Sequence, residues 1–120
     1  MRKQLTKAQR TKVYEKYNGH CAYCGKEIAY KDMQVDHLVP LADYPFGRGE
    51  DTLENMMPAC RRCNHYKRAN PLENWRRMIE EIPYKMERDS YIYKVGVDYG
   101  LVEPKPHKVQ FYFELAGEQE

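Results

Sequence analysis

The sequence predicts a single small α+β domain that is held together by a metal. Its four cysteines form two Cys-x-x-Cys pairs, Cys21 with Cys24 and Cys60 with Cys63. Apolar residues recur with helical spacing in several segments, whereas residues 109–115 alternate with the period of a half-buried strand. A chain of 120 residues buries little apolar surface, so a metal would add useful stability.

Composition places the chain among globular proteins and excludes a membrane-spanning one. Charged residues make up 32% and hydrophobic residues 42% of the sequence. No apolar run approaches the about 18 residues that a membrane span needs, and the basic N-terminus lacks the apolar segment of a secretory signal. We therefore expect a soluble, cytoplasmic protein with no membrane partner.

Positive charge is concentrated in two places, although the net charge of +2 does not by itself indicate a nucleic-acid partner. These are the first helix, with Lys7, Arg10, Lys12 and Lys16, and the surroundings of the last cysteine, with Arg61, Arg62, Lys67 and Arg68. The first group is typical of a solvated helix face. The second flanks the motif described below, which favours contacts with phosphates.

The first half of the chain predicts a helix, a hairpin and a loop. A helix over residues 7–17 begins at a capping box made by Thr6 and Gln9. Residues 28–35 have short-strand character with a turn near Lys31 and Asp32, which predicts a hairpin ending at Asp36-His37. Proline and glycine mark residues 40–51 as a surface loop in which Arg48 could reach a ligand.

The second half of the chain predicts three helices and a strand. The first helix spans residues 61–68, and the second is capped by Asn70 and Glu73, with Leu72, Trp75, Ile79 and Ile82 on its apolar face. Pro83 ends the second, and Asp89 or Ser90 caps a third that Gly100 stops. Pro104 and Pro106 then form a rigid connector to the strand at residues 109–115.

The two cysteine pairs indicate a tetrahedral zinc site. In an intracellular protein this pattern favours zinc over disulfides, and the thioredoxin-like setting of a redox Cys-x-x-Cys is missing. Because four thiolates leave no open coordination position, this zinc would be structural and any chemistry would lie elsewhere. The gap between the pairs exceeds the about 15 to 20 residues of an ordinary zinc ribbon, so a further element is inserted there.

That insert carries residues suited to phosphodiester hydrolysis. It contains Asp36-His37 and, shortly before the second cysteine pair, Asn55, while Asn64 directly follows the last cysteine. With both cysteine pairs, this order resembles the HNH endonuclease family over about residues 20–68. The resemblance implies a ββα-metal core, in which a hairpin and a helix hold one catalytic divalent ion.

The resemblance also implies a role for each residue. His37 is the general base, Asp36 and Asn64 bind the catalytic metal, and Asn55 fixes the loop that orients His37. The last position is often His in the family, and Asn is a known variant. Residues 1–120 would form one HNH nuclease domain, with a core at about residues 20–70 and a helical and strand extension at about 71–116.

The outer parts of the chain resemble, more loosely, short HNH proteins of bacteriophages. This resemblance implies a bacterial or phage-infected cell as the source. Double-stranded DNA is then the expected partner, with Arg61, Arg62, Lys67 and Arg68 on its phosphates.

The expected chemistry is consistent with the residue types themselves. A carboxylate and an amide oxygen are ligands that Mg²⁺ or Mn²⁺ accepts, and a histidine suits removal of the proton from water near neutrality. Each residue alone has a structural interpretation: the Asp-His pair as a turn, Asn55 as a cap, Asn64 as a helix start. Two alternatives therefore stay open, a non-catalytic zinc knuckle that binds nucleic acid and a zinc-stabilised protein-interaction domain. The sequence does not indicate oligomeric state or DNA sequence preference.

Overall fold

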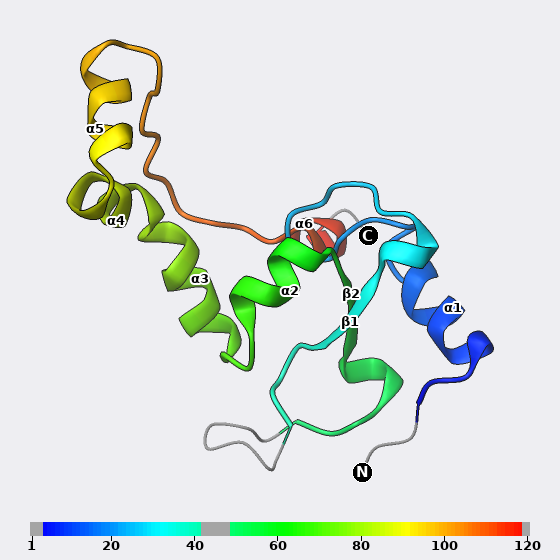
Figure 1. Ribbon diagram of the computed structural model, residues 1–120. Helices are drawn as coiled ribbons and strands as arrows, with labels where there is room; N and C mark the ends of the chain where they lie inside the picture. The colour runs from blue at the N-terminus through cyan, green and yellow to red at the C-terminus, as the bar shows by residue number, and fades with distance from the viewer. Residues whose placement is uncertain (1–3, 42–48, 119–120) are drawn as a thin grey trace. The chain divides into compact units, whose positions relative to one another are not determined.

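The computed structural model describes residues 4–41 and 49–118 (Figure 1). The chain divides into two compact units, one made of Met1–Leu72 with Gln110–Glu120 and the other of Glu73–Val109. Arg48 and most of the predicted loop at residues 40–51 lie outside the described residues. No helix in the described segments is long and apolar enough to cross a membrane.

The first unit begins with helix α1, Lys7–Glu15. The predicted capping box is confirmed, since Thr6 Oγ1 accepts from the Gln9 amide and Gln9 Oε1 accepts from the Thr6 amide. Two basic side chains, one in α1 and one at its C-cap, donate hydrogen bonds to backbone carbonyls outside the helix. Arg10 donates to the carbonyls of Tyr30 and Met33, and Lys16 Nζ donates to those of Leu53, Glu54 and Met56. Arg10 is therefore partly buried, in contrast to the expected solvated face, whereas Lys16 stays exposed as expected.

A two-stranded antiparallel sheet forms the centre of this unit. Strand β1, Gln34–His37, pairs with β2, Met56–Ala59, with His37 opposite Met56 and Gln34 opposite Ala59. The predicted hairpin at residues 28–35 is wrong, because its turn residues form the 3-10 helix η1, Tyr30–Asp32, and β1 pairs across a long connection instead. A second 3-10 helix, η2 at Leu53–Asn55, leads into β2. All four β2 residues are buried, so β2 lacks the alternation that identifies a half-buried strand.

Helix α2, Arg61–Lys67, follows β2 directly, close to the predicted bounds, and packs against β1. Its chain reverses at Arg68, which has a positive φ of 54°. The Asn70 side chain donates to the carbonyl of Lys67 and so bonds to the end of α2. Its predicted role as the cap of the next helix stays a prediction.

The last element of the first unit is helix α6, Tyr112–Glu118, where a strand at residues 109–115 was predicted. Glu114 Oε1 accepts from the Phe111 amide at the start of the helix, and the amides of Tyr112 and Phe113 bond to the carbonyls of Tyr23 and Ala22. The strand prediction is wrong because the alternating apolar residues are also compatible with a helix, in which Phe111 and Leu115, four residues apart, fall on the same side. A strand would also need a neighbour, and the described residues provide none beside this segment.

The second unit contains most of helix α3, Leu72–Glu80, then α4, Ile82–Asp89, and α5, Tyr91–Asp98. Trp75 is its most buried residue. Pro83 separates α3 from α4, as predicted, but also lies in the first turn of α4, a helix that the sequence did not indicate. Ser90 Oγ caps α5 by accepting from the Tyr93 amide, which confirms one of the two predicted caps.

Candidate metal centre and active site

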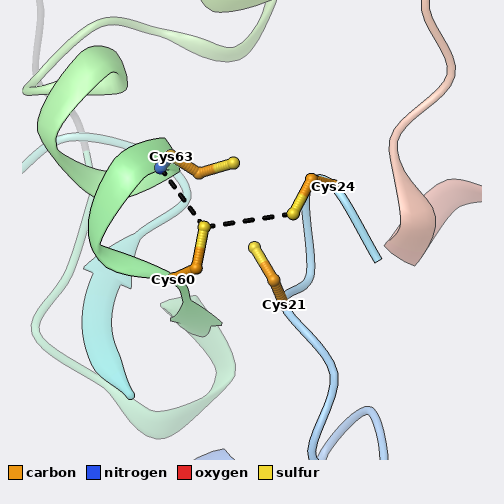
Figure 2. A group of neighbouring side chains, drawn as sticks. All are labelled: Cys21, Cys24, Cys60 and Cys63. Carbon is orange, nitrogen blue, oxygen red and sulfur yellow. Dashed lines mark hydrogen bonds between the residues drawn. The ribbon is translucent and has the colours of Figure 1, made fainter. Parts of the chain in front are cut away.

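The four cysteines meet in the first unit, as the sequence predicted. Cys21 and Cys24 lie on the loop after α1, Cys60 is the N-cap of α2, and Cys63 lies in its first turn. Their sulfurs point toward one another (Figure 2) and all lie within 4.8 Å, with Cys24 and Cys60 Sγ 3.9 Å apart. Tetrahedral zinc with Zn–S bonds of about 2.3 Å places sulfurs about 3.8 Å apart, so this set fits zinc.

Backbone geometry holds the cysteine loops in this arrangement. Gly25 has a positive φ of 82°, a conformation that favours glycine, and its amide donates to the carbonyl of Cys21. A Cβ at Gly25 would lie 2.9 Å from the Tyr112 ring of α6. The Ala22 amide donates to the carbonyl of Pro58 in β2. The first cysteine loop is therefore fixed to the same strand that leads to the second.

Hydrogen bonding between the thiols separates their pKa values. The bond with Cys63 lowers the pKa of Cys21 to about 4, and the same bond, together with burial, raises the pKa of Cys63 well above its usual range. Burial is also the largest cause of the raised pKa of Cys24. Since zinc binds thiolates, its uptake displaces thiol protons, and acid should weaken its binding.

Asp36 lies at the centre of a buried polar cluster. Its side chain is 7% exposed, and its Oδ2 atom accepts from the Tyr23 hydroxyl at 2.5 Å and lies 3.0 Å from Lys67 Nζ. Burial, and then the Asp36 charge, raises the pKa of Tyr23, so the phenol stays protonated and donates. Both contacts engage Oδ2, which leaves Oδ1 of Asp36 for another ligand.

Asn64 faces the same strand as this cluster. Its Nδ2 donates to Gln34 Oε1 at 2.7 Å, which leaves its amide oxygen for another ligand. Gln34 and Asp36 lie on one face of β1, and their partners Asn64 and Lys67 are one turn apart on α2. His65 is exposed, which is consistent with Asn64 being the residue that faces β1.

His37 ends β1, where its ring contacts a residue that the sequence did not indicate. Its Nε2 lies 2.8 Å from Oδ1 of Asp51. Asn55 holds the two chain segments beside this contact: its side chain bonds to both backbone groups of Val39 and to the carbonyl of Glu50, each at 2.9 Å. Asn55 therefore bonds to the segments that follow His37 and precede Asp51, and its role in orienting His37 stays a prediction.

The four basic residues around the last cysteine do not share one environment. Arg61, Arg62 and Arg68 are exposed. Lys67 is fully buried, with its ammonium near Asp36 and bonded to the His37 carbonyl at 3.1 Å. The structure therefore differs from the expectation that Lys67 contacts DNA phosphates. Lys67 is buried because it lies three residues after Asn64 in α2 and therefore on the same, β1-facing side of the helix.

Three contacts of the site were missed in the sequence: Tyr23 with Asp36, Gln34 with Asn64, and Asp51 with His37. The alternation of β1 could have suggested Gln34, because it lies two residues from Asp36 and so on the same face. Tyr23 and Asp51 come from loops, and their positions depend on tertiary packing that local patterns do not describe.

Comparisons with known proteins select the same part of the chain. Residues 21–70 match the family model described as HNH endonuclease. Two relatives are named CRISPR-associated endonuclease Cas9: that of Corynebacterium diphtheriae is 39% identical over 62 residues, and that of Actinomyces naeslundii is 39% identical over 56. These alignments cover 51% and 46% of this chain, but only 5% of each relative.

A solved structure supports the same similarity. The crystal structure of the Type II-C Cas9 enzyme from Actinomyces naeslundii superposes with a TM-score of 0.50 and 30% sequence identity. The match covers 64% of this chain and 8% of that chain. Both sequence and fold therefore confirm the resemblance to the HNH family that the motif predicted.

Proposed function

We propose that this chain, whose residues 21–70 are an HNH endonuclease domain, is a divalent-metal-dependent endonuclease that hydrolyses phosphodiester bonds in double-stranded DNA. The observation that carries the proposal is the placement of Asp36, His37 and Asn64. The first two end one strand, and the third faces that strand from α2. A structural zinc on the four cysteines would fix the start of α2.

The donor set fits a hard catalytic cation. Asp36 and Asn64 would hold one Mg²⁺ or Mn²⁺ through a carboxylate and an amide oxygen, with water and substrate in its other positions. When bound, this cation would neutralise charge that develops on the phosphate and the departing oxygen. Lys67 and Tyr23 keep the Asp36 carboxylate in place from the opposite oxygen.

His37 would act as the general base. It takes one proton from water as the water oxygen forms a bond to phosphorus, the P–O3′ bond breaks, and the departing oxygen gains a proton from solvent. The exposed Arg61, Arg62 and Arg68 would hold flanking phosphates and provide affinity without sequence readout.

The test is a nicking assay on supercoiled plasmid with the zinc-loaded chain. We expect nicking with Mg²⁺ or Mn²⁺, none with EDTA, and nicking that is about 10²- to 10⁴-fold slower for His37→Ala. His65→Ala is the matched control, because it removes an exposed histidine of α2 and should retain activity. DNA binding without cleavage in any divalent metal would contradict the proposal and favour the non-catalytic zinc knuckle.

A further inference from the structure

We infer that Asp51 is a positioning residue that holds the His37 ring in the orientation and tautomer needed for proton transfer. This inference rests on the proposed function for the role of His37, but its structural basis is independent. Asp51 Oδ1 lies 2.8 Å from Nε2 of His37, within the range of a charge-assisted hydrogen bond. No motif in the sequence assigns this aspartate.

The contact defines which ring nitrogen carries the proton. An ionised carboxylate only accepts hydrogen bonds, so Nε2 must donate to Asp51 and the lone pair of the neutral ring then lies on Nδ1. His37 would accept the water proton at Nδ1 while Nε2–H stays bonded to Asp51. The cationic ring that forms would be stabilised by the carboxylate, which itself remains unprotonated.

The backbone on both sides of the contact is fixed by Asn55. Its side chain bonds to Val39, two residues after His37, and to the Glu50 carbonyl, one residue before Asp51. Its own carbonyl accepts from the Leu38 amide at 2.9 Å. Asn55 thus joins the two segments whose side chains meet, which gives a physical reason for its place in the site.

Gly49 permits this close approach. Its amide donates to the Pro40 carbonyl at 2.7 Å, and a Cβ at this position would collide with the carbonyl oxygens of Val39 and Pro40 and with the Asn55 amide nitrogen. Only glycine fits without moving that backbone. The position of Asp51 is therefore set by packed backbone on the preceding side.

Within the described part of the chain, Lys67 and Asp36 also place charged side chains near His37. The Lys67 ammonium bonds to the His37 carbonyl, not to its ring, and Asp36 points to the other face of β1. The Asp51 side chain is 41% exposed and that of His37 is 14% exposed, so solvent competes for the carboxylate more than for the ring. If Asp51 instead bound the cation directly, its loss would change the Mg²⁺ dependence of cleavage.

The experiment compares Asp51→Ala and Asp51→Asn with Glu50→Ala in the zinc-loaded chain. Glu50→Ala removes an exposed carboxylate from the adjacent position and retains the backbone carbonyl that Asn55 binds. Single-turnover cleavage, DNA affinity, Mg²⁺ dependence and zinc content are measured for each. We expect Asp51→Ala to cleave about 10- to 100-fold more slowly at unchanged DNA affinity, as for other residues that orient a functional histidine. Asp51→Asn should recover part of the rate, because its amide oxygen can still accept from Nε2.

A second measurement does not depend on activity. ¹⁵N-edited NMR of the imidazoles in alkaline buffer, where the rings are neutral, should show the Nε2–H tautomer for His37 in the parent chain and in Glu50→Ala, and a mixture in Asp51→Ala. Any of three results would overturn the inference: Asp51→Ala cleaves as fast as Glu50→Ala, the His37 tautomer is the same in both variants, or excess Mg²⁺ restores cleavage by Asp51→Ala. If the parent chain does not cleave DNA, the proposed function fails, and the NMR comparison still decides whether Asp51 positions the ring.

Discussion

Replacing Lys67 with Met should destabilise the first unit more than any exposed substitution in α2. The variant leaves the Asp36 carboxylate buried at 7% exposure without the ammonium that lies 3.0 Å from it. At an effective dielectric constant of about 20, that separation corresponds to about 5 kcal/mol of attraction. Removing one partner of a buried ion pair typically costs about 3–5 kcal/mol. We therefore expect Lys67→Met to lower the free energy of unfolding by about that amount.

The assay is urea unfolding at constant free zinc, followed by near-ultraviolet circular dichroism of the buried tyrosines. Arg62→Met is the control, since it removes an exposed cation from the same helix and should change the free energy of unfolding by less than about 0.5 kcal/mol. The double variant Asp36→Asn, Lys67→Met should recover part of the loss, because no unpaired charge remains. Equal urea midpoints for Lys67→Met and Arg62→Met would show that the buried ion pair does not form.

The remaining predictions concern the two proposed metal sites and the residues that contact them. Cys60→Ser should lose its zinc together with most of the fold, which native mass spectrometry and circular dichroism can show. His37→Ala should cleave about 10²- to 10⁴-fold more slowly in single turnover while it stays folded, and a parental rate would refute the general-base role. Asn64→Ala should lose Mg²⁺-dependent cleavage, Asn64→His should retain some of it, and His65→Ala should retain most. The measurement is a metal titration of cleavage for the three variants. The reverse order of activity would assign the metal ligand to His65 instead of Asn64. Tyr23→Phe should lower the free energy of unfolding by about 1–3 kcal/mol, measured by urea unfolding, because Asp36 loses a buried hydrogen bond.

Local chemistry in the sequence was sufficient to predict the four-cysteine cluster and several helix ends. The cysteine spacing indicated four thiolates in one site, and their sulfurs do meet. The capping box at Thr6 and the Ser90 cap depend on side chains that bond within three residues, so they can be recognised without knowing the fold. Features of this kind are local in sequence and local in space.

Pairing between distant segments was not predictable in the same way. Strand β2 has no alternation because all its residues are buried, so nothing marked it as the partner of β1. The strand predicted at residues 109–115 needed a neighbouring strand to bond with. The segment instead forms helix α6, and Phe111 just before it packs against the ring of Tyr23, with 5.6 Å between the ring centroids. Lys67 was assigned to DNA by its charge, whereas its helix face directs it to Asp36.

The two proposed metal sites are linked through α2, although only one of them would take part in chemistry. Cys60 and Cys63 place the first turn of this helix, and Asn64 and Lys67 follow on its β1-facing side. A shift of that first turn would therefore move the proposed metal ligand and the cation that balances Asp36 together. Structural zinc would thus control the geometry of hydrolysis without contacting the substrate. By this reasoning zinc removal abolishes cleavage even when Mg²⁺ is saturating, because added Mg²⁺ cannot restore the position of α2.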